Sequence, residues 1–364
     1  MKTLEQRQAD CEKVSKKIEK LGNEGLAAIL KDTTQVHSGI GGTAVILEID
    51  GVPVFAKQIA VSDLEMQHLG STANLFNLPT YYQYGVGSAG FGAWRELEAH
   101  KMTTDWVLRD ECPNFPLMYG YAVLPREKPA EPLDEARLEE MTQYWGGSEA
   151  VKERLNGINT ASNSLVVFLE AVSRPHGLDP RLECYIHPQA SQGDMTRPDM
   201  AMVERELKAT CAFMESKGMI HFDAHHRNIL TDGVRLYFAD FGLATSLDFD
   251  LSAKEREFIY EHWGYDLSLA TSSLCWHPRA ESGEELLILP EVQKVSDRYK
   301  PVSEKYGTFM RSLRNDSTKT TPYPASEMQA LHRQVDDEKP RSFVEAMQAG
   351  KYGKMKSPSG AHEL

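Results

Sequence analysis

The sequence predicts an α+β fold in two lobes, a small β-rich first lobe and a larger, mainly helical second lobe. A chain of 364 residues is long enough to bury a large core and usually forms two domains or lobes. In the first part, short apolar runs meet at Asp50-Gly51, a dipeptide typical of tight β-hairpins. In the later part, apolar residues recur at helical spacing over residues 197–217.

The composition indicates a globular protein of a reducing compartment. Hydrophobic residues make up 41% and charged residues 26% of the chain, as in ordinary soluble domains. A net charge of −13 would repel phosphate backbones, which argues against a nucleic-acid partner. The five cysteines are scattered and form no C-x-x-C pair, so we expect free thiols. Because there is no apolar signal core and no apolar run long enough to cross a bilayer, we expect a cytoplasmic protein without a membrane partner.

The chain begins with a predicted amphipathic helix over residues 4–31, with interruptions expected at Gly22 and Gly25. This helix either packs on the rest of the protein or binds a partner, and packing is the more frequent role of such a segment.

A glycine cluster formed by Gly39, Gly41 and Gly42 then separates two strand-like runs. The hairpin at Asp50-Gly51 follows it and leads to Lys57. Glycines let backbone N–H groups approach phosphate oxygens, although a glycine-rich hairpin is also typical of a plain turn. A lone lysine is more often solvated than functional.

A helix is predicted over residues 90–108, separated from Lys57 by an extra segment around residues 71–88 that is rich in tyrosine and glycine. This segment either shapes an acceptor site, acts as a lid, or is a structural elaboration of the first lobe.

The later elements follow from the same patterns. We expect a strand region over 112–124, a proline-marked insertion over 125–162 with helices around 134–144 and 148–155, a buried strand over 165–169, and partly helical structure over 254–276. The predicted units are therefore an N-terminal helix (1–31), a first lobe with insertions (32–172), a second lobe (173–302), and a polar, partly disordered C-terminal extension (303–364).

The most informative stretch runs over residues 218–243, in which two short apolar runs flank the turn Asp232-Gly233. This hairpin places Asp223 and Asn228 just before its first strand and Asp240 just after its second. Three oxygen-bearing side chains are therefore expected to meet at one end of a two-stranded ribbon.

The pattern His-x-Asp-x-x-x-x-Asn at His221, Asp223 and Asn228, followed by Asp-Phe-Gly at Asp240, resembles the catalytic and metal-binding loops of the protein-kinase-like superfamily. The spelling His-x-Asp-x-His-x-x-Asn, with His225, is similar to that of aminoglycoside and choline phosphotransferases. The spelling Ala-Asp-Phe-Gly-Leu-Ala instead looks like that of protein kinases. A polar turn followed by a chance Asp-Phe-Gly is the plain alternative.

The resemblance covers roughly residues 35–270 and implies a two-lobed kinase-like fold that binds ATP and Mg²⁺. It implies that Asp223 takes the proton of an acceptor hydroxyl, and that Asn228 and Asp240 hold magnesium. Arg227 is a candidate cation for the γ-phosphate, with a surface arginine as the alternative. His221 is expected to brace the loop, and Asp266 to support it from below.

In the first lobe, the resemblance implies that Lys57 grips the phosphates and that Gly39, Gly41 and Gly42 cover them. The lysine should pair with a glutamate of the 90–108 helix, where Glu96 and Glu98 face different ways. We favour Glu98, because it shares an apolar face with the residues spaced by four along the helix: Trp94, Met102 and Trp106. The strand running into Glu170 would hold the adenine through backbone groups.

The implied reaction is transfer of the γ-phosphoryl group of ATP to a hydroxyl. A protein Ser or Thr is the favoured acceptor, because the sequences around Lys57 and Asp240 are protein-kinase-like. A small-molecule kinase, favoured by His225, is the first alternative. A non-catalytic nucleotide-binding scaffold is the second. With Phe222 in place of an arginine before Asp223, we expect no switching by a phosphorylated loop.

Overall fold

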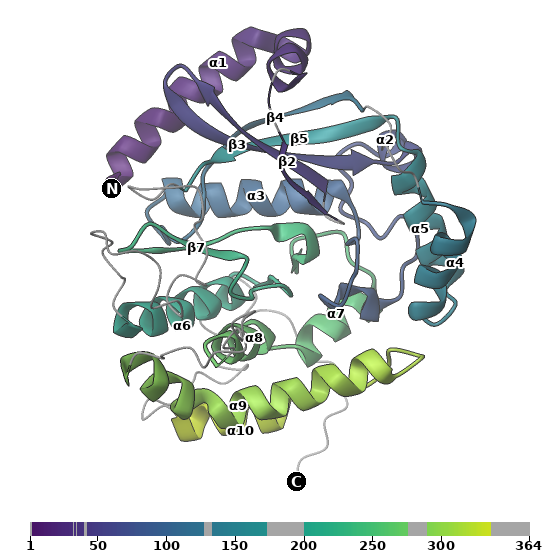
Figure 1. Ribbon diagram of the computed structural model, residues 1–364, viewed down its shortest axis with the longest axis vertical. Coiled ribbons are helices and arrows are strands. Elements are labelled where there is room, and N and C mark those ends of the chain that lie inside the picture. Colours follow the sequence, from purple (N-terminus) through teal and green to yellow (C-terminus); the bar gives the residue numbers. More distant parts are fainter. Residues whose placement is uncertain are drawn as a thin grey trace, which may run out of the picture.

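The computed structural model describes residues 2–31, 33, 35–39, 42–126, 133–172, 200–275 and 290–335. It shows a mixed α+β protein in which a small antiparallel sheet lies beside a larger group of helices (Figure 1). The five-stranded sheet has the order β1-β2-β3-β5-β4, and every neighbouring pair is antiparallel. Its strands are β1 (Gln35–Gly39), β2 (Gly42–Ile49), β3 (Val52–Val61), β4 (Met118–Pro125) and β5 (Asn163–Glu170).

The hairpin between β2 and β3 turns at the expected dipeptide. Asp50 and Gly51 both adopt positive φ angles, 50° and 78°, which is the geometry of the tight turn that Asp-Gly favours. The register then places Lys57 opposite Ala44 of β2 and Val167 of β5, so that the lysine is on a central strand.

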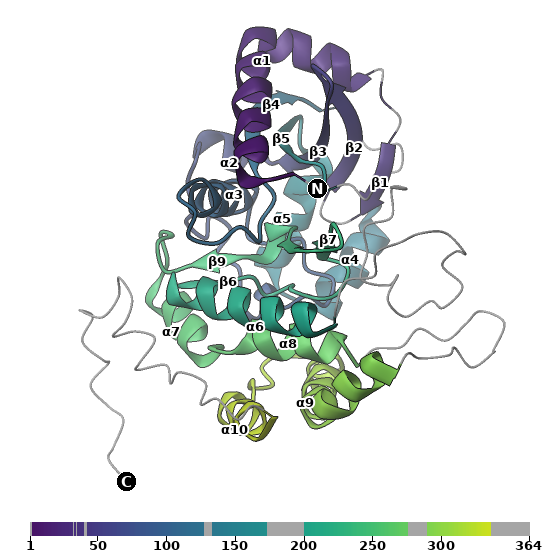
Figure 2. The same cartoon turned by 90° about the vertical axis from the view of Figure 1, so that its left-hand side faces the viewer.

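Two helices cover opposite faces of the sheet (Figures 1 and 2). α1 (Leu4–Lys31) is broken at Gly22, whose φ of 59° is not helical, as predicted, whereas the interruption predicted at Gly25 is wrong, because Gly25 is helical. α3 (Ala93–Leu108) lies on the other face. Its Trp94 and Leu97 pack with Leu165 and Val167 of β5 in a buried apolar cluster.

Between β3 and α3 the chain forms α2 (Asp63–Gln67) and a short 3-10 helix, η1 (Thr80–Gln83). Between β4 and β5 it forms α4 (Glu135–Tyr144) and α5 (Glu149–Thr160), close to the two predicted helices.

The remaining described elements form the helical part of the molecule (Figure 2). The helices are α6 (Met200–Ser216), α7 (Ala253–Glu261), α8 (Tyr265–Ser273), α9 (Pro290–Asn315) and α10 (Ala325–Val335). Two small ribbons accompany them, β6 (Met219–Ile220) with β9 (Thr245–Ser246), and β7 (Ile229–Thr231) with β8 (Leu236–Phe238). Another 3-10 helix, η3 (Phe241–Leu243), begins directly after Asp240.

The structure corrects the predicted C-terminal extension. The boundary expected between residues 302 and 303 falls inside α9, and α9 packs on α8 and α10. Tyr306, Phe309 and Leu313 of α9 are buried, as is Met328 of α10. Polar residues on the outer faces of these helices made the segment look like a tail, but residues 303–335 belong to the folded core. Residues 336–364 lie outside the described residues.

Within the described part of the chain, no helix combines the length and the apolar character needed to cross a bilayer.

Candidate active site

The β7–β8 hairpin brings the three predicted oxygen-bearing residues to one end of a ribbon. Its loop is longer than the dipeptide alone suggests, because the last strand pair is Thr231 with Leu236. Within the loop, Oδ1 of Asp232 accepts hydrogen bonds from the backbone N–H groups of Val234 and Arg235. At the other end, the N–H of Ala239 donates to the carbonyl oxygen of Asn228 (2.9 Å). This bond holds the residues before β7 beside those after β8.

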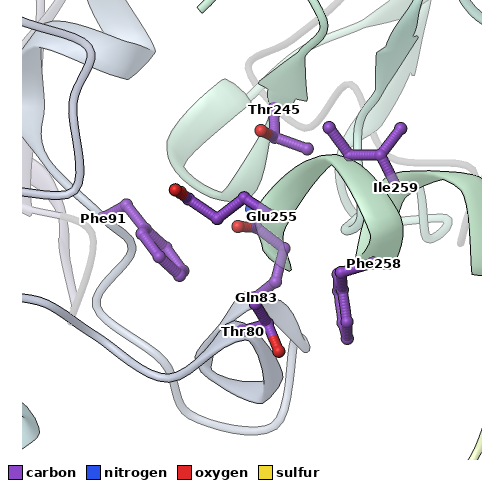
Figure 3. Close-up of a pocket in the computed structure, with 7 residues that line it drawn as sticks. All are labelled: Thr80, Gln83, Phe91, Thr245, Glu255, Phe258 and Ile259. Carbon is purple, nitrogen blue, oxygen red and sulfur yellow. The ribbon is translucent and has the colours of Figure 1, made fainter. Parts of the chain in front are cut away.

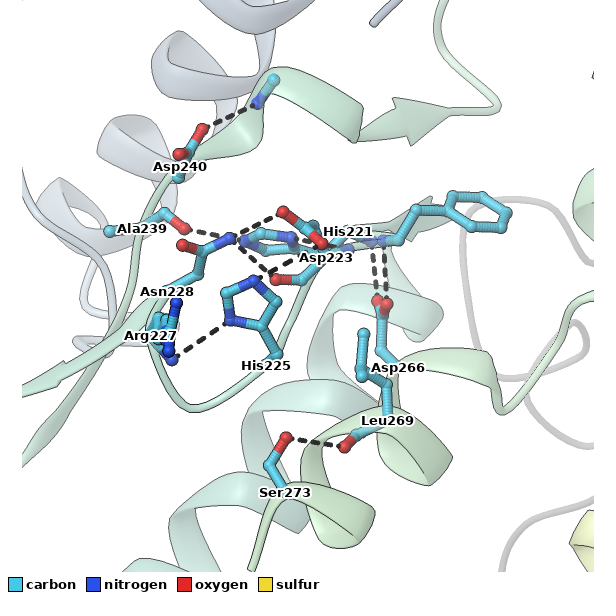
Figure 4. Close-up of polar contacts among 12 residues, drawn as sticks. His221, Asp223, His225, Arg227, Asn228, Ala239, Asp240, Asp266, Leu269 and Ser273 are labelled. Atoms are coloured by element: carbon cyan, nitrogen blue, oxygen red, sulfur yellow. Dashed lines mark hydrogen bonds and ion pairs between the residues drawn. The ribbon is translucent and has the colours of Figure 1, made fainter. Parts of the chain in front are cut away.

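The loop before the hairpin is supported by Asp266, in the first turn of α8 (Figure 4). Its carboxylate accepts hydrogen bonds from the N–H groups of His221 (2.6 Å) and Phe222 (2.9 Å). Phe222 is buried and has a φ of 60°, an unfavourable conformation for a bulky residue that surrounding structure must hold in place. Asp266 therefore lies below the loop, where the sequence placed it.

His221 braces the loop from inside. Its Nδ1 accepts from the N–H of Asp223 (3.3 Å), so the proton is on Nε2, which donates to the carbonyl oxygen of Ala239 (3.1 Å). Burial lowers the pKa of His221 to about 4, so the ring is neutral at physiological pH. A neutral imidazole with a hydrogen bond at each ring nitrogen positions the loop and does not transfer a proton.

The two carboxylate oxygens of Asp223 have different surroundings. Nδ2 of Asn228 donates to Oδ2 (2.9 Å) and to the carbonyl oxygen of Asp223 (3.0 Å). Oδ1 is left facing Nε2 of His225 at 3.7 Å. Burial raises the pKa of Asp223 to about 6, and the nearby charge of Asp240 acts in the same direction. Asp223 is thus a carboxylate with one oxygen held and a pKa close to physiological pH.

Lys57 reaches this group from the sheet. Its Nζ lies 2.7 Å from Oδ1 of Asp240 and 2.5 Å from Oε1 of Glu96. Burial alone would lower the pKa of Lys57, but the two carboxylates outweigh burial and raise it, so the ammonium stays charged. Burial would likewise raise the pKa of Asp240, but the charge of Lys57 holds it well below its usual range.

The partner of Lys57 on α3 is Glu96, which corrects the prediction of Glu98. The side chain of Glu98 is 42% exposed and pairs with Lys101, whereas that of Glu96 is 4% exposed. The apolar spacing was misleading because α3 is buried on more than one side. Glu96 shares its face with His100, one turn later, and His100 packs edge-on against Phe241.

The glycine cluster is described in part. Gly39 and Gly42 face each other across the β1–β2 hairpin, and Gly41 lies outside the described residues. Gly42 has a φ of 119°, and a Cβ there would lie 2.1 Å from the carbonyl oxygen of Gln58, so only glycine fits. Gly39 and Gly42 therefore lie at the turn end of the β1–β2 hairpin, with Gly42 two residues before Ala44, which pairs with Lys57.

Glu170 was predicted to help hold the adenine through backbone groups; its N–H is already used within the protein, and the role of its carbonyl oxygen stays a prediction. Its carboxylate is held by Arg7 of α1 and by the N–H of Leu117, and its own N–H donates to the carbonyl oxygen of Leu117. Sequence patterns gave no sign that a helix 163 residues away would occupy this side chain.

Arg227 lies on the same loop as Asn228 and is exposed. Its N–H donates to Nδ1 of His225 (3.1 Å), which orients the histidine ring toward Asp223 (Figure 4).

The donor set at the ribbon end suits Mg²⁺, which prefers oxygen ligands and is usually held by one or two carboxylates together with substrate phosphates. The side chain of Asp240 is 46% exposed and its low pKa keeps it ionised. The side chain of Asn228 makes its hydrogen bonds through Nδ2, which leaves its Oδ1 able to bind a cation. In the described ranges no group of three or more His, Cys, Asp or Glu side chains is placed to hold a metal ion.

No protein-family model matches the chain, and no curated protein sequence is significantly similar to it.

Proposed function

We propose that the protein is a phosphotransferase with a two-lobed, protein-kinase-like arrangement, which moves the γ-phosphoryl group of Mg-ATP to a hydroxyl acceptor. The observation that supports this most strongly is the meeting of Lys57, from the sheet, with Asp240, from the end of the β7–β8 hairpin, at 2.7 Å. The two residues are 183 positions apart in sequence. A chance Asp-Phe-Gly has no reason to lie beside a lysine buried in a central strand.

In this proposal each residue has a distinct task. Magnesium, when bound, would neutralise charge on the triphosphate, with Asp240 and Oδ1 of Asn228 as its ligands from the chain. Lys57, kept in place by Glu96, would hold the phosphates. Oδ1 of Asp223 would accept the proton of the attacking hydroxyl, since Oδ2 is already held by Asn228. Positioning and electrostatics supply most of the rate in such a site.

Two other functions were considered from the sequence. A small-molecule kinase gains support from His225, whose Nε2 lies 3.7 Å from Oδ1 of Asp223 and can orient a small polar acceptor. A nucleotide-binding scaffold without activity gains none, because Lys57 is in contact with both Glu96 and Asp240, and Asp223 is present beside them.

The test is a phosphotransfer assay on the full chain with γ-labelled ATP. We expect turnover of ATP that requires Mg²⁺ and is lost on chelation. An Asp240→Ala preparation made in the same way controls for contaminating kinases and should be inactive. Equal turnover by the wild type and Asp240→Ala, or none by either, would contradict the proposed function.

Glu96 and Glu98 offer a matched pair of variants. Glu96→Gln is expected to lower the rate of phosphoryl transfer by about 10²-fold, because displacing a positioning group by about 1 Å can have an effect of that size. Glu98→Gln should leave the rate within about twofold, since Glu98 makes only an exposed pair with Lys101. Steady-state kinetics measure both variants. A larger loss of rate in Glu98→Gln than in Glu96→Gln would restore Glu98 as the partner of Lys57.

The activity should depend on pH through Asp223. A base must be deprotonated to act, and burial raises the pKa of this carboxyl to about 6. Activity should therefore be full above this pKa and fall tenfold per pH unit below it. A profile of kcat/KM at saturating Mg²⁺ checks this, and a flat profile between pH 5 and pH 7 would show that Asp223 is not the base.

A further inference from the structure

Residues 80–90, which we call the strap, run between the sheet part and the helical part of the molecule. Tyr82 and Tyr84 of the strap are buried, at 0% and 2% exposure. The ring of Tyr84 packs among aromatic side chains of the loop before β7 and of α7, α8 and α9: Phe222, Phe258, His262, Tyr265 and Phe309. These two tyrosines therefore anchor the strap in the hydrophobic core, although Gly87 at its turn is exposed.

Hydrogen bonds fix the strap near its middle, at Tyr84, and at its C-terminal end, at Gly90. Nδ1 of His262 donates to the carbonyl oxygen of Phe258 (2.7 Å), so Nε2 accepts from the hydroxyl of Tyr84 (2.5 Å). At the C-terminal end, Nε of Arg154 donates to the carbonyl oxygen of Gly90 (3.2 Å), and Nη1 of Arg154 pairs with buried Glu65 (2.7 Å). Lifting the strap would break buried polar bonds and expose two tyrosine rings together.

The strap passes directly over Asp223. A Cβ at Gly85 would lie 2.3 Å from Oδ1, closer than any hydrogen-bonded oxygen approaches a carboxylate. Nothing larger than the glycine backbone therefore fits between the strap and Oδ1 on this side. Gly90 is equally close to the chain after Asp240, since a Cβ there would lie 2.2 Å from the carbonyl oxygen of Gly242.

The chain after Asp240 is buried where an extended peptide would have to pair with it. Phe241 and residues 243–247 are at most 7% exposed. The side-chain amide of Gln83 donates to the carbonyl oxygen of Leu243, and β9 is already paired with β6. A peptide that adds to a sheet as an extra strand needs accessible backbone groups, and Phe241 and residues 243–247 are too buried to offer them.

The seam between the strap and α7 contains a small pocket (Figure 3). It is lined from the strap by Thr80 and Gln83 and from α7 by Glu255 and Phe258. Its empty volume of 190 Å³ includes space open to solvent and is below the roughly 300–1,000 Å³ of ligand pockets. Asp223 does not line this pocket.

We infer that the strap is a fixed wall of the acceptor site, which keeps an extended polypeptide away from Asp223, so that the accepting hydroxyl belongs to a small molecule. This inference rests on the proposed phosphotransfer function. It differs from the sequence analysis, which favoured a protein acceptor. The acceptor has to reach Oδ1 from the side of His225, past a carboxylate that is only 22% exposed.

The acceptor class is tested by dividing the labelled-ATP assay into two arms. One arm contains casein, an unfolded protein rich in Ser and Thr, and the other an ultrafiltrate of small molecules from a bacterial lysate. We expect label on small molecules, at least tenfold above any label on casein or on the chain itself, and lost in Asp223→Asn. Label on casein at an equal or higher rate would overturn the inference. No Mg²⁺-dependent turnover of ATP in either arm contradicts the proposed function instead.

The wall itself is tested without activity by hydrogen exchange of the full chain with and without Mg-ATP. Residues 80–90 should be as protected as the central strands in both states. Fast exchange, or loss of protection on adding nucleotide, would show a lid that an acceptor protein can displace.

Gly85→Ala adds a kinetic test of the same contact. It should lower transfer by about tenfold or more, because the new Cβ displaces the Asp223 carboxylate. Gly307→Ala is the control, since its Cβ would meet only the end of the Arg311 side chain. Full activity of a folded Gly85→Ala variant would show that the strap leaves Asp223 during turnover.

Discussion

Asp223→Asn is expected to lower the rate of phosphoryl transfer by about 10²–10⁴-fold, the range that a positioned general base contributes. Asparagine keeps the shape of the side chain and an oxygen that can accept from Nδ2 of Asn228, so the loop should remain in place. What is lost is the basic oxygen that faces the acceptor. The KM for ATP should change little, because the phosphates are held by Lys57 and the metal rather than by Asp223.

Asp232→Asn is the matched control on the same hairpin. Asp232 caps the turn through Oδ1, and an asparagine oxygen accepts the same two backbone hydrogen bonds. Its activity should stay within about twofold of the wild type, because the exchange removes charge far from the ribbon end that carries Asp240. Steady-state kinetics of Asp223→Asn and Asp232→Asn test whether Asp223 is the general base. A fall of less than tenfold in Asp223→Asn would mean that the base is another residue or that the chemistry needs none.

Local patterns predicted much of this molecule, because local physics determines those parts. Both Asp-Gly turns became hairpins: Asp50 and Gly51 adopt the positive φ angles that this dipeptide tolerates, and in the second hairpin Gly233 does so. The two helices of the 125–162 insertion appear within a few residues of their expected bounds, because helix periodicity and capping act over short distances. The convergence of Asp223, Asn228 and Asp240 followed from the hairpin alone.

Features that depend on tertiary packing could not be read in this way. The choice between Glu96 and Glu98 required knowing that α3 is buried on more than one side, so that an apolar stripe no longer marks a single buried face. A signal was present in His100, which follows Glu96 by one helical turn, but a histidine is ambiguous between core and surface. The closeness of Gly85 to Asp223 joins two segments more than a hundred residues apart, and no sequence spacing encodes it.

The dependence of the sheet on α1 was also invisible in the sequence. Arg7 looked like one polar residue of an amphipathic helix, but it is fully buried and donates to Glu170 and to the carbonyl oxygens of Pro113 and Phe115. It also lies over the ring of Tyr237 in β8, at 5.2 Å. One side chain of α1 therefore connects the end of β5, the segment before β4 and the β7–β8 hairpin.

Arg7→Met is accordingly expected to lower the free energy of unfolding by about 3–5 kcal/mol, the usual cost of removing one partner of a buried ion pair. The carboxylate of Glu170, 6% exposed, would keep only the N–H of Leu117, and two carbonyl oxygens would lose their donor. Chemical denaturation of the full chain, with the transition midpoint read at constant m value, measures the effect. Lys16→Met on the same helix is the control and should change stability by less than about 0.5 kcal/mol, because its pair with Glu12 is exposed.

The double variant Arg7→Met/Glu170→Met separates the ion pair from simple packing. If the loss in Arg7→Met comes from a stranded charge, removing that charge should recover part of it, since apolar replacements of a buried pair are often neutral. Recovery should stay incomplete, because the carbonyl oxygens of Pro113 and Phe115 remain without their donor. Losses that simply add would show that Arg7 acts through packing alone. A loss within about 1 kcal/mol in Arg7→Met would mean that α1 is not held to the end of β5 by this pair.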